Sequence, residues 1–251
     1  MRVGTRGSAL ALAQAQAVMD ALGGGELVVI ATAGDRDRER RFDQIGSGRG
    51  VFTREIEAAL LAGRIDAAVH SAKDLTGDMP DGLVIGAIPE RADPRDACCG
   101  PYAALDELPP GCRVGTSSAR RAGLLAELRP DVQVVPLRGN VDTRLRKLDA
   151  GEADAIILAA AGLDRLGLSH RIGFHLDPQV FVPEAGQGAL AVQVRAGEEA
   201  RVAGLDHQPS RRAVEAERAT AAELGGGCTV PVAAHAWHAG GRLQLRSWAA
   251  S

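Results

Sequence analysis

The segment 70–74 sets acidic, basic and hydroxyl side chains next to one another. It reads His70-Ser71-Ala72-Lys73-Asp74 and directly follows an apolar run. Asp74 could act as a general acid or base, or its negative charge could stabilise a cationic intermediate. A capping aspartate in a turn is the alternative, because Gly77 and Pro80 come soon after it. The segment predicts either a reacting carboxylate or an ordinary turn.

Three further segments combine arginines with hydroxyl groups and glycines. Gly115-Thr116-Ser117-Ser118-Ala119-Arg120-Arg121 places a strand end before a helix N-terminus, where free N–H groups attract anions. Leu137-Arg138-Gly139-Asn140-Val141-Asp142-Thr143-Arg144 repeats this design, as does Gly4-Thr5-Arg6-Gly7-Ser8. The planar arginine fork suits carboxylates and phosphates. We interpret these segments as anion sites, with simple helix caps and solvated arginines as the alternative.

Three single residues are weaker candidates. Arg49 stands at the glycine-rich end of the stretch 33–50, which is long enough to form a lid. Arg165 could supply another cation, although a surface helix arginine is the more common explanation. Cys228 follows three glycines, as expected of a thiol that reacts or carries a group, with a casual surface cysteine as the alternative.

Short strands alternate with amphipathic helices along the chain and must position these residues. We expect strands at 3–5, 27–32, 65–69, 83–88, 113–115, 132–135, 155–158, 189–194, 230–237 and 243–248. We expect helices at 8–22, 52–61, 118–128, 141–148 and 211–224. This order predicts an α/β fold with mostly parallel sheets covered on both faces. If strand 189–194 rejoined the first sheet, the chain would cross twice between two domains and leave an arginine-lined cleft between them.

The composition is that of an ordinary globular protein. Of the 251 residues, 45% are hydrophobic and 24% charged, which favours a folded core. A formal net charge of −3 and 3% aromatic residues argue against nucleic-acid binding. The sequence shows no signal peptide and no membrane-spanning run, so we expect a cytoplasmic protein. We interpret three cysteines as small buried apolar residues: Cys98, Cys99 and Cys112.

Several motifs, taken in order, closely resemble the porphobilinogen deaminase (hydroxymethylbilane synthase) family. They are Gly4-Thr5-Arg6-Gly7-Ser8, Val69-His70-Ser71-Ala72-Lys73-Asp74, Asp93-Pro94-Arg95-Asp96, Gly115-Thr116-Ser117-Ser118, Leu137-Arg138-Gly139-Asn140-Val141, Ala160-Ala161-Gly162-Leu163, Gly186-Gln187-Gly188 and Gly226-Gly227-Cys228. Each motif alone is weak, but together they run through essentially the whole chain.

The resemblance implies two periplasmic-binding-protein-like α/β domains with a cleft between them and a small, apparently shortened α+β C-terminal domain. The expected boundaries are 1–90 with 188–207 for the first domain, 94–183 for the second and 208–251 for the third. It also implies a monomeric transferase that joins four porphobilinogen molecules head to tail and releases ammonia. The product is linear hydroxymethylbilane for tetrapyrrole (heme) biosynthesis.

The resemblance further assigns roles to individual residues. Asp74 would be the catalytic carboxylate, and Cys228 would carry a dipyrromethane cofactor through a thioether. Cofactor binding would fall to Lys73, Ser71, Thr116, Ser117, Ser118, Arg120, Arg121, Arg138 and Gly139. Substrate binding would fall to Arg6, Ser8, Arg49, Arg144, Arg165 and Gln187. No metal, nucleic acid or membrane is expected to take part.

The sequence departs from the family pattern in three places. Leu75-Thr76 stands where the family usually has a proline two residues after the aspartate, and Arg49 replaces a lysine between glycines. The chain reaches Ser251 before the family's final strand and helix. A catalytically silent two-domain anion-binding paralogue is therefore the alternative function. An exported anion-binding protein is a third possibility that the missing export signal disfavours.

Overall fold

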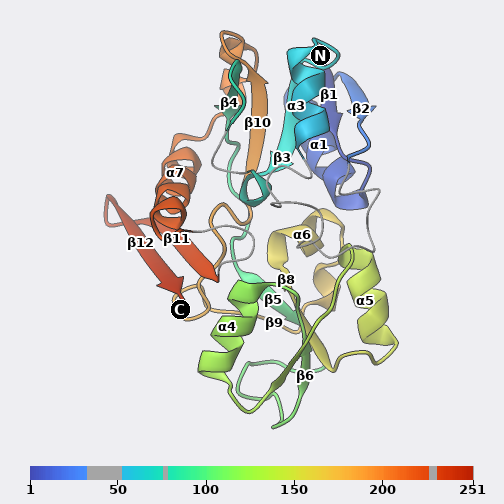
Figure 1. Cartoon of the computed structure of the whole chain (residues 1–251), viewed down its shortest axis with the longest axis vertical. Helices are drawn as coiled ribbons and strands as arrows, with labels where there is room; N and C mark the ends of the chain where they lie inside the picture. The colour runs from blue at the N-terminus through green and yellow to red at the C-terminus, as the bar shows by residue number, and fades with distance from the viewer. Residues whose placement is uncertain (33–52, 76–78, 226–230, 251) are drawn as a thin grey trace. The chain divides into compact units, whose positions relative to one another are not determined.

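A computed structural model describes residues 1–32, 53–75, 79–225 and 231–250. Within these ranges the chain divides into two compact units (Figure 1). Unit 1 comprises Met1–Arg91 and Ala189–Glu215, and unit 2 comprises Ala92–Gly188 and Ala216–Ser251. Two of the predicted site residues, Arg49 and Cys228, lie outside the described residues.

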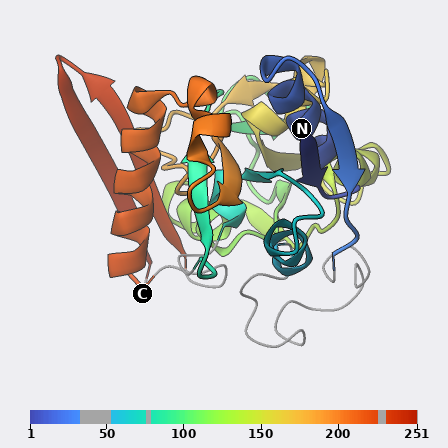
Figure 2. The same cartoon turned by 90° about the horizontal axis from the view of Figure 1, so that it is seen from above.

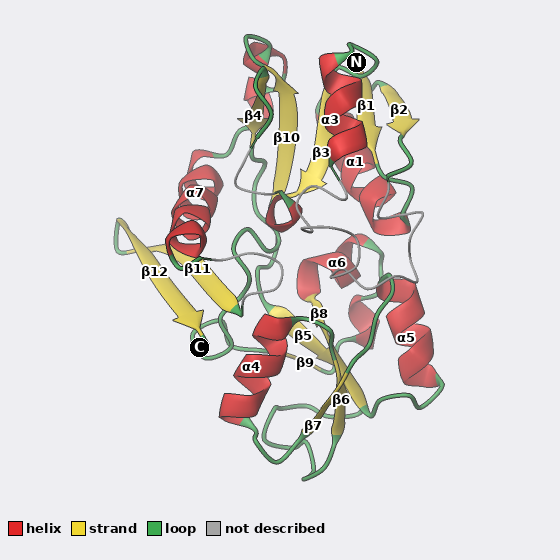
Figure 3. Cartoon of the chain, viewed as in Figure 1, coloured by secondary structure: helices red, strands yellow, loops and turns green. Residues whose placement is uncertain are grey.

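Unit 1 is built on a five-stranded mixed sheet with the order β2-β1-β3-β10-β4 (Figure 3). Its strands are β1 (Arg2–Thr5), β2 (Glu26–Val29), β3 (Ala67–Ser71), β4 (Leu83–Ala87) and β10 (Leu190–Arg195). β1 pairs in parallel with β2 and β3, whereas β10 pairs antiparallel with β3 and β4. β10, which comes late in the chain, therefore rejoins the first sheet. It runs antiparallel to the other four strands.

Alternating residues of the unit 1 strands pack on two helical layers. Val69 of β3 joins the core cluster that contains Val18 of α1 (Ala9–Ala21). Its neighbour Ala68 joins the cluster that contains Ile56 of α3 (Arg54–Leu61). Successive side chains of a strand point to opposite faces of the sheet. Helices thus cover both faces of the sheet, as the sequence predicted.

Unit 2 repeats this plan in a second five-stranded sheet with the order β7-β6-β8-β5-β9. Its strands are β5 (Asp96–Cys99), β6 (Arg113–Gly115), β7 (Gln133–Val135), β8 (Ala155–Ala159) and β9 (Phe174–His175). Its helices include α4 (Ala119–Leu128), α5 (Val141–Asp149) and α6 (Ala160–Arg165). β6 is parallel to β7 and β8, and β5 is antiparallel to β8 and β9. Cys98, Cys99 and Cys112 are free and buried here, as expected.

The C-terminal part of unit 2 is an antiparallel hairpin of β11 (Val232–Ala239) and β12 (Arg242–Ala249). Figure 2 shows this hairpin beside α7 (Gln208–Glu223), whose first half belongs to unit 1. The buried carboxylate of Glu217 in α7 accepts hydrogen bonds from the backbone N–H groups of Gly186 and Ala236, both at 2.7 Å. Trp248 Nε1 donates to Glu127 Oε2 at 2.7 Å, which joins the hairpin to α4.

The predicted α/β fold class is confirmed, and one strand boundary differs in a way that affects the site. The strand expected at 65–69 is Ala67–Ser71 in the structure, so His70 and Ser71 belong to β3. They are held there because β10 pairs with them, with Ser71 opposite Leu190. In the described part of the chain, no helix is long and apolar enough to cross a membrane.

Candidate active site

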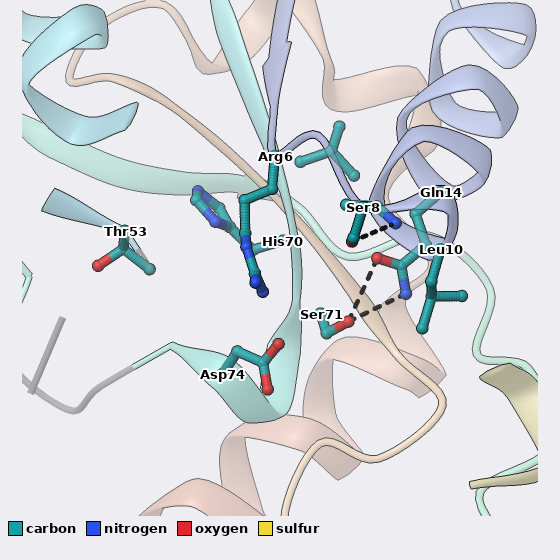
Figure 4. Close-up of a pocket in the computed structure, with 10 residues that line it drawn as sticks. Arg6, Ser8, Leu10, Gln14, Thr53, His70, Ser71 and Asp74 are labelled. Atoms are coloured by element: carbon teal, nitrogen blue, oxygen red, sulfur yellow. Dashed lines mark hydrogen bonds between the residues drawn. The ribbon is translucent and has the colours of Figure 1, made fainter. Parts of the chain in front are cut away.

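A polar pocket of about 60 Å³ lies in unit 1, where β1 and β3 end (Figure 4). It is lined by Arg6, Ser8, Leu10, Ala11, Gln14, Thr53, Val69, His70, Ser71 and Asp74. The carboxyl ends of parallel strands meet at one edge of a sheet, and β1 is parallel to β3. Arg6 and Asp74 are therefore brought together although they lie far apart in the sequence.

Asp74 closes a short 3₁₀ turn, η2 (Ala72–Asp74), that follows β3 directly. The backbone N–H of Ala72 donates to the carbonyl oxygen of Ala189 at 3.0 Å, which ties the turn to the segment before β10. In Figure 4 the Asp74 carboxylate faces the pocket, and the Arg6 guanidinium points toward the same space. The turn expected at this segment is thus present, and its carboxylate lies on the pocket.

Two hydroxyl groups on this pocket are fixed by local hydrogen bonds. Ser8 caps α1, because its Oγ accepts from the backbone N–H of Ala11 at 3.3 Å. Ser71 Oγ accepts from Gln14 Nε2 at 2.9 Å. Gln14 is buried, with 5% of its surface exposed. The sequence motifs predict Ser8 and Ser71 as site residues but not Gln14, which lies on the same helix as the cap.

His70 is a buried, uncharged member of the pocket wall. Its Nε2 lies 3.1 Å from Gln193 Oε1. Burial lowers the pKa of His70 to about 4, and the positive charge of Arg6 acts in the same direction. The imidazole is therefore neutral at physiological pH. The sequence motifs assign no role to His70 itself.

In unit 2, the residues between β6 and α4 form a capped helix start. Thr116 Oγ1 accepts from the backbone N–H of Ser118 at 3.2 Å, and Ser118 Oγ accepts from that of Arg121 at 3.4 Å. Thr116 is buried, whereas Ser117 is exposed. This arrangement matches the predicted strand end, hydroxyl group and helix N-terminus.

The next two arginines bind the buried carboxylate of Asp96, a residue to which its motif Asp93-Pro94-Arg95-Asp96 assigned no role. Arg120 Nη1 donates to Asp96 Oδ2 at 2.8 Å, and Arg121 Nη2 donates to Asp96 Oδ1 at 2.7 Å. Gln187 Nε2 also donates to Asp96 Oδ1, at 3.0 Å. Burial alone would raise the pKa of Asp96, but the two guanidinium groups hold it well below its usual range. The sequence signal for this carboxylate is the position of Asp96 at the start of β5, whose other residues are apolar.

A cluster of three arginines, Arg121, Arg138 and Arg144, forms beside this ion pair. Arg144 Nε donates to the carbonyl oxygen of Gly139 at 2.8 Å. Burial lowers the pKa of Arg144 to about 10, and the charges of Arg121 and Arg138 add to this effect. Gly139 has φ +123°, and a Cβ there would lie 2.6 Å from a methyl group of Thr143, so glycine is required. Concentrated positive charge of this kind suits a ligand with several carboxylates.

The remaining predicted residues occupy separate places. Arg165 Nη2 donates to the carbonyl oxygen of Gly188 at 2.7 Å, and burial lowers the pKa of Arg165. Lys73 is half-buried in η2. Among the described residues, no group of three or more His, Cys, Asp or Glu side chains could hold a metal ion. The candidates thus form two groups, the unit 1 pocket and the unit 2 arginine cluster.

Comparison with solved structures finds similarities at low sequence identity. The chain resembles a putative methionine-binding lipoprotein from Bacillus subtilis, with TM-score 0.46 and 14% identity, covering 82% of this chain and 87% of that one. It also resembles a nutrient binding protein from Burkholderia cenocepacia bound to methionine, with TM-score 0.46 and 14% identity, covering 90% and 97% of the two chains.

Sequence comparison gives a much closer relationship. Residues 1–203 match the family model "Porphobilinogen deaminase, dipyromethane cofactor binding domain", and residues 211–250 match "Porphobilinogen deaminase, C-terminal domain". A porphobilinogen deaminase of Syntrophobacter fumaroxidans is 48% identical, covering 100% of this chain and 84% of that protein. One from Roseiflexus sp. is 52% identical, covering 97% and 84%. The chain therefore belongs to the porphobilinogen deaminase family.

Proposed function

We propose that this chain is a hydroxymethylbilane synthase, a transferase that joins four porphobilinogen molecules head to tail and releases ammonia. Family membership across the whole chain supports this activity, its place in tetrapyrrole biosynthesis and the dipyrromethane cofactor. The same matches do not favour the alternative of a silent anion-binding paralogue. The observation that carries the proposal is the unit 1 pocket, which brings Asp74 and Arg6 to one place.

Asp74 is the proposed catalytic carboxylate. When the carbon–nitrogen bond of the substrate's aminomethyl group breaks, ammonia leaves with the bonding electrons and the pyrrole becomes a cationic azafulvene. The negative charge of a carboxylate beside the pocket stabilises this cation. The cation is consumed when a new carbon–carbon bond forms and the attacked carbon loses its proton. Arg6 and Ser8, which line the same pocket, would bind the substrate's acetate and propionate groups meanwhile.

Arg120, Arg121 and Arg138 of unit 2 form the proposed cofactor-binding surface, and their chemistry fits a dipyrromethane with four carboxylate groups. Arg120 gives a specific sign of this fit. Its Nε and Nη2 atoms are buried and have no hydrogen-bond partner among the described residues. Buried unsatisfied donors are costly, and a ligand carboxylate would satisfy them. When bound, the dipyrromethane supplies the free pyrrole carbon to which the first substrate unit is joined.

The other assigned residues complete this proposal. Thr116, Ser117, Ser118, Arg121, Arg138 and Gly139, with Lys73 and Ser71, would bind the cofactor. Arg49, Arg144, Arg165 and Gln187 would bind the substrate and growing chain. The boundaries 1–90 with 188–207, 94–183 and 208–251 remain the predicted domains. A monomeric state and a cytoplasmic location also stay predictions.

Intact-mass measurement tests the proposal, because Cys228 is the predicted tether. The parent protein, purified from cells that make porphobilinogen, should carry an adduct of two pyrrole units. Cys228→Ala should carry none, whereas Cys112→Ala, which alters a buried free thiol, should keep it. With added porphobilinogen, the parent should release one ammonia for each substrate consumed. An unmodified parent that releases no ammonia would overturn the proposed function.

A further inference from the structure

Three buried polar side chains form a line of hydrogen bonds inside unit 1, behind the pocket wall. They are His70 on β3, Gln193 on β10 and Glu57 on α3, with exposures of 6%, 0% and 9%. His70 Nε2 lies 3.1 Å from Gln193 Oε1, and Gln193 Nε2 donates to Glu57 Oε1 at 3.4 Å. The line connects the pocket to the helix that covers this face of the sheet.

The strand register explains why these side chains meet. β10 runs antiparallel to β3, with Gln193 opposite Ala68. His70 is two residues from Ala68 and therefore points to the same face. Ala68 packs in the core cluster with Ile56 of α3, the neighbour of Glu57. His70 and Gln193 therefore share one face of the sheet, and the hydrogen bond from Gln193 links them to Glu57 of α3, which packs on this face.

The chemistry of the three groups fixes the direction of every hydrogen bond. A carboxylate only accepts, so the group of Gln193 that faces Glu57 must be its NH₂. The Gln193 amide oxygen then faces His70 and also only accepts. His70 must therefore carry its proton on Nε2, and Nδ1 is left with a lone pair. A protonated His70 would be disfavoured by burial and by the charge of Arg6.

We infer that Glu57 and Gln193 are positioning residues that hold His70 in its neutral, Nε2-protonated form, and that Nδ1 of His70 accepts a hydrogen bond from the aminomethyl ammonium of porphobilinogen. This inference rests on the proposed function for its substrate. A neutral acceptor can orient the ammonium group without competing with Asp74 for its charge. Asp74 then remains the charged acceptor for the cation that forms when ammonia leaves.

The position of the proton can be measured without any turnover. Selective ¹⁵N labelling of histidine and NMR of the cofactor-loaded protein should show His70 with a protonated Nε2 and an unprotonated Nδ1 at neutral pH. Gln193→Leu should abolish this preference, while Gln133→Leu, a matched change at an exposed glutamine, should not. A proton on Nδ1, or on both nitrogens, in the parent protein would overturn the inference.

Two substitutions of His70 separate substrate positioning from a purely structural role. The amide of Asn overlaps the Nδ1 position of histidine, and the amide of Gln overlaps the Nε2 position. We expect His70→Gln to keep the internal contact to Gln193 but to raise KM about tenfold, since one hydrogen bond is lost. His70→Asn should keep KM within about threefold of the parent value, even where its thermal stability is lower.

The reverse pattern, with a KM defect in His70→Asn and none in His70→Gln, would show that His70 serves only the internal contact. Should both variants fail to fold, the tautomer measurement on the parent still decides the first half of the inference. Ammonia release by the parent is measured in the same preparation. If the proposed function is wrong, the parent releases no ammonia. If only the inference about His70 is wrong, the parent still releases ammonia.

Discussion

The unit 1 pocket and the unit 2 arginine cluster are built on the same sheet plan but differ in how their charges are balanced. In unit 1, neutral groups hold the pocket wall, as in the contacts of Ser71 with Gln14 and of His70 with Gln193. In unit 2, two arginines bind Asp96, and Arg144 has cations as its electrostatic neighbours. A single carboxylate such as Asp74 beside the reacting centre suits a step that creates a cation, whereas concentrated positive charge suits the anchoring of carboxylates.

Removal of the Asp74 charge should give the largest effect. Asp74→Asn keeps the shape of the side chain but loses the charge that stabilises the cationic azafulvene. We expect kcat to fall by about 10²–10³-fold, the typical loss when one stabilising group is removed. Ammonia release gives the rate, and intact mass should show that the cofactor adduct is retained. Near-normal turnover would remove Asp74 from the catalytic role.

The Asp96 ion pairs should dominate the stability of unit 2. Asp96→Asn leaves the buried Arg120 and Arg121 without their carboxylate, and loss of one partner of a buried pair costs about 3–5 kcal/mol. Denaturant unfolding measures this loss. Asp131→Asn, which breaks a more exposed pair with Arg129, should cost far less. Equal losses of unfolding free energy in the two variants would mean that the buried Asp96 ion pairs stabilise the protein no more than the exposed pair does.

The same network predicts a direction for acid sensitivity. The folded-state pKa of Asp96 lies below its ordinary value of 3.8, so its contribution is complete above that value. The contribution is lost as the pH falls further and the folded carboxylate takes up a proton. The parent should therefore lose more stability below about pH 4 than Asp96→Asn does. Parallel acid titrations of the two proteins would contradict this.

Arg144 should matter for ligand binding rather than for folding. Arg144→Ala removes a charge-assisted contact to a carboxylate, and we expect KM to rise by about 10- to 100-fold. Arg146→Ala provides a matched control on the same helix, because Arg146 is exposed and bonds to Thr143. Equal KM values for the two variants would exclude Arg144 from the site.

Substitution of the two helix-capping serines should give the smallest effect, a loss of stability. Ser118→Ala removes the hydroxyl that accepts from the N–H of Arg121, and cap loss costs about 1 kcal/mol. Ser8→Ala should cost a similar amount in unit 1. Thermal unfolding measures both. If either variant loses far more, its hydroxyl has a role beyond the cap.

Local sequence signals predicted the elements well, and long-range pairing explains what they missed. Ser8 and Ser118 do cap their helices, because a cap depends on residues within one turn. The extension of β3 through Ser71 depends on β10, a strand that comes much later in the chain. The partner of Arg120 and Arg121 was equally hidden, since nothing near those residues indicates which carboxylate they meet.

The two groups of candidates are distinguished most directly by intact mass after addition of porphobilinogen. The parent protein should carry two pyrrole units and gain further units one at a time as the chain grows. Asp74→Asn should keep the two units but gain no more within the time in which the parent completes a product. If Asp74→Asn gains units at the parent's rate, the unit 1 pocket is not where the chemistry occurs.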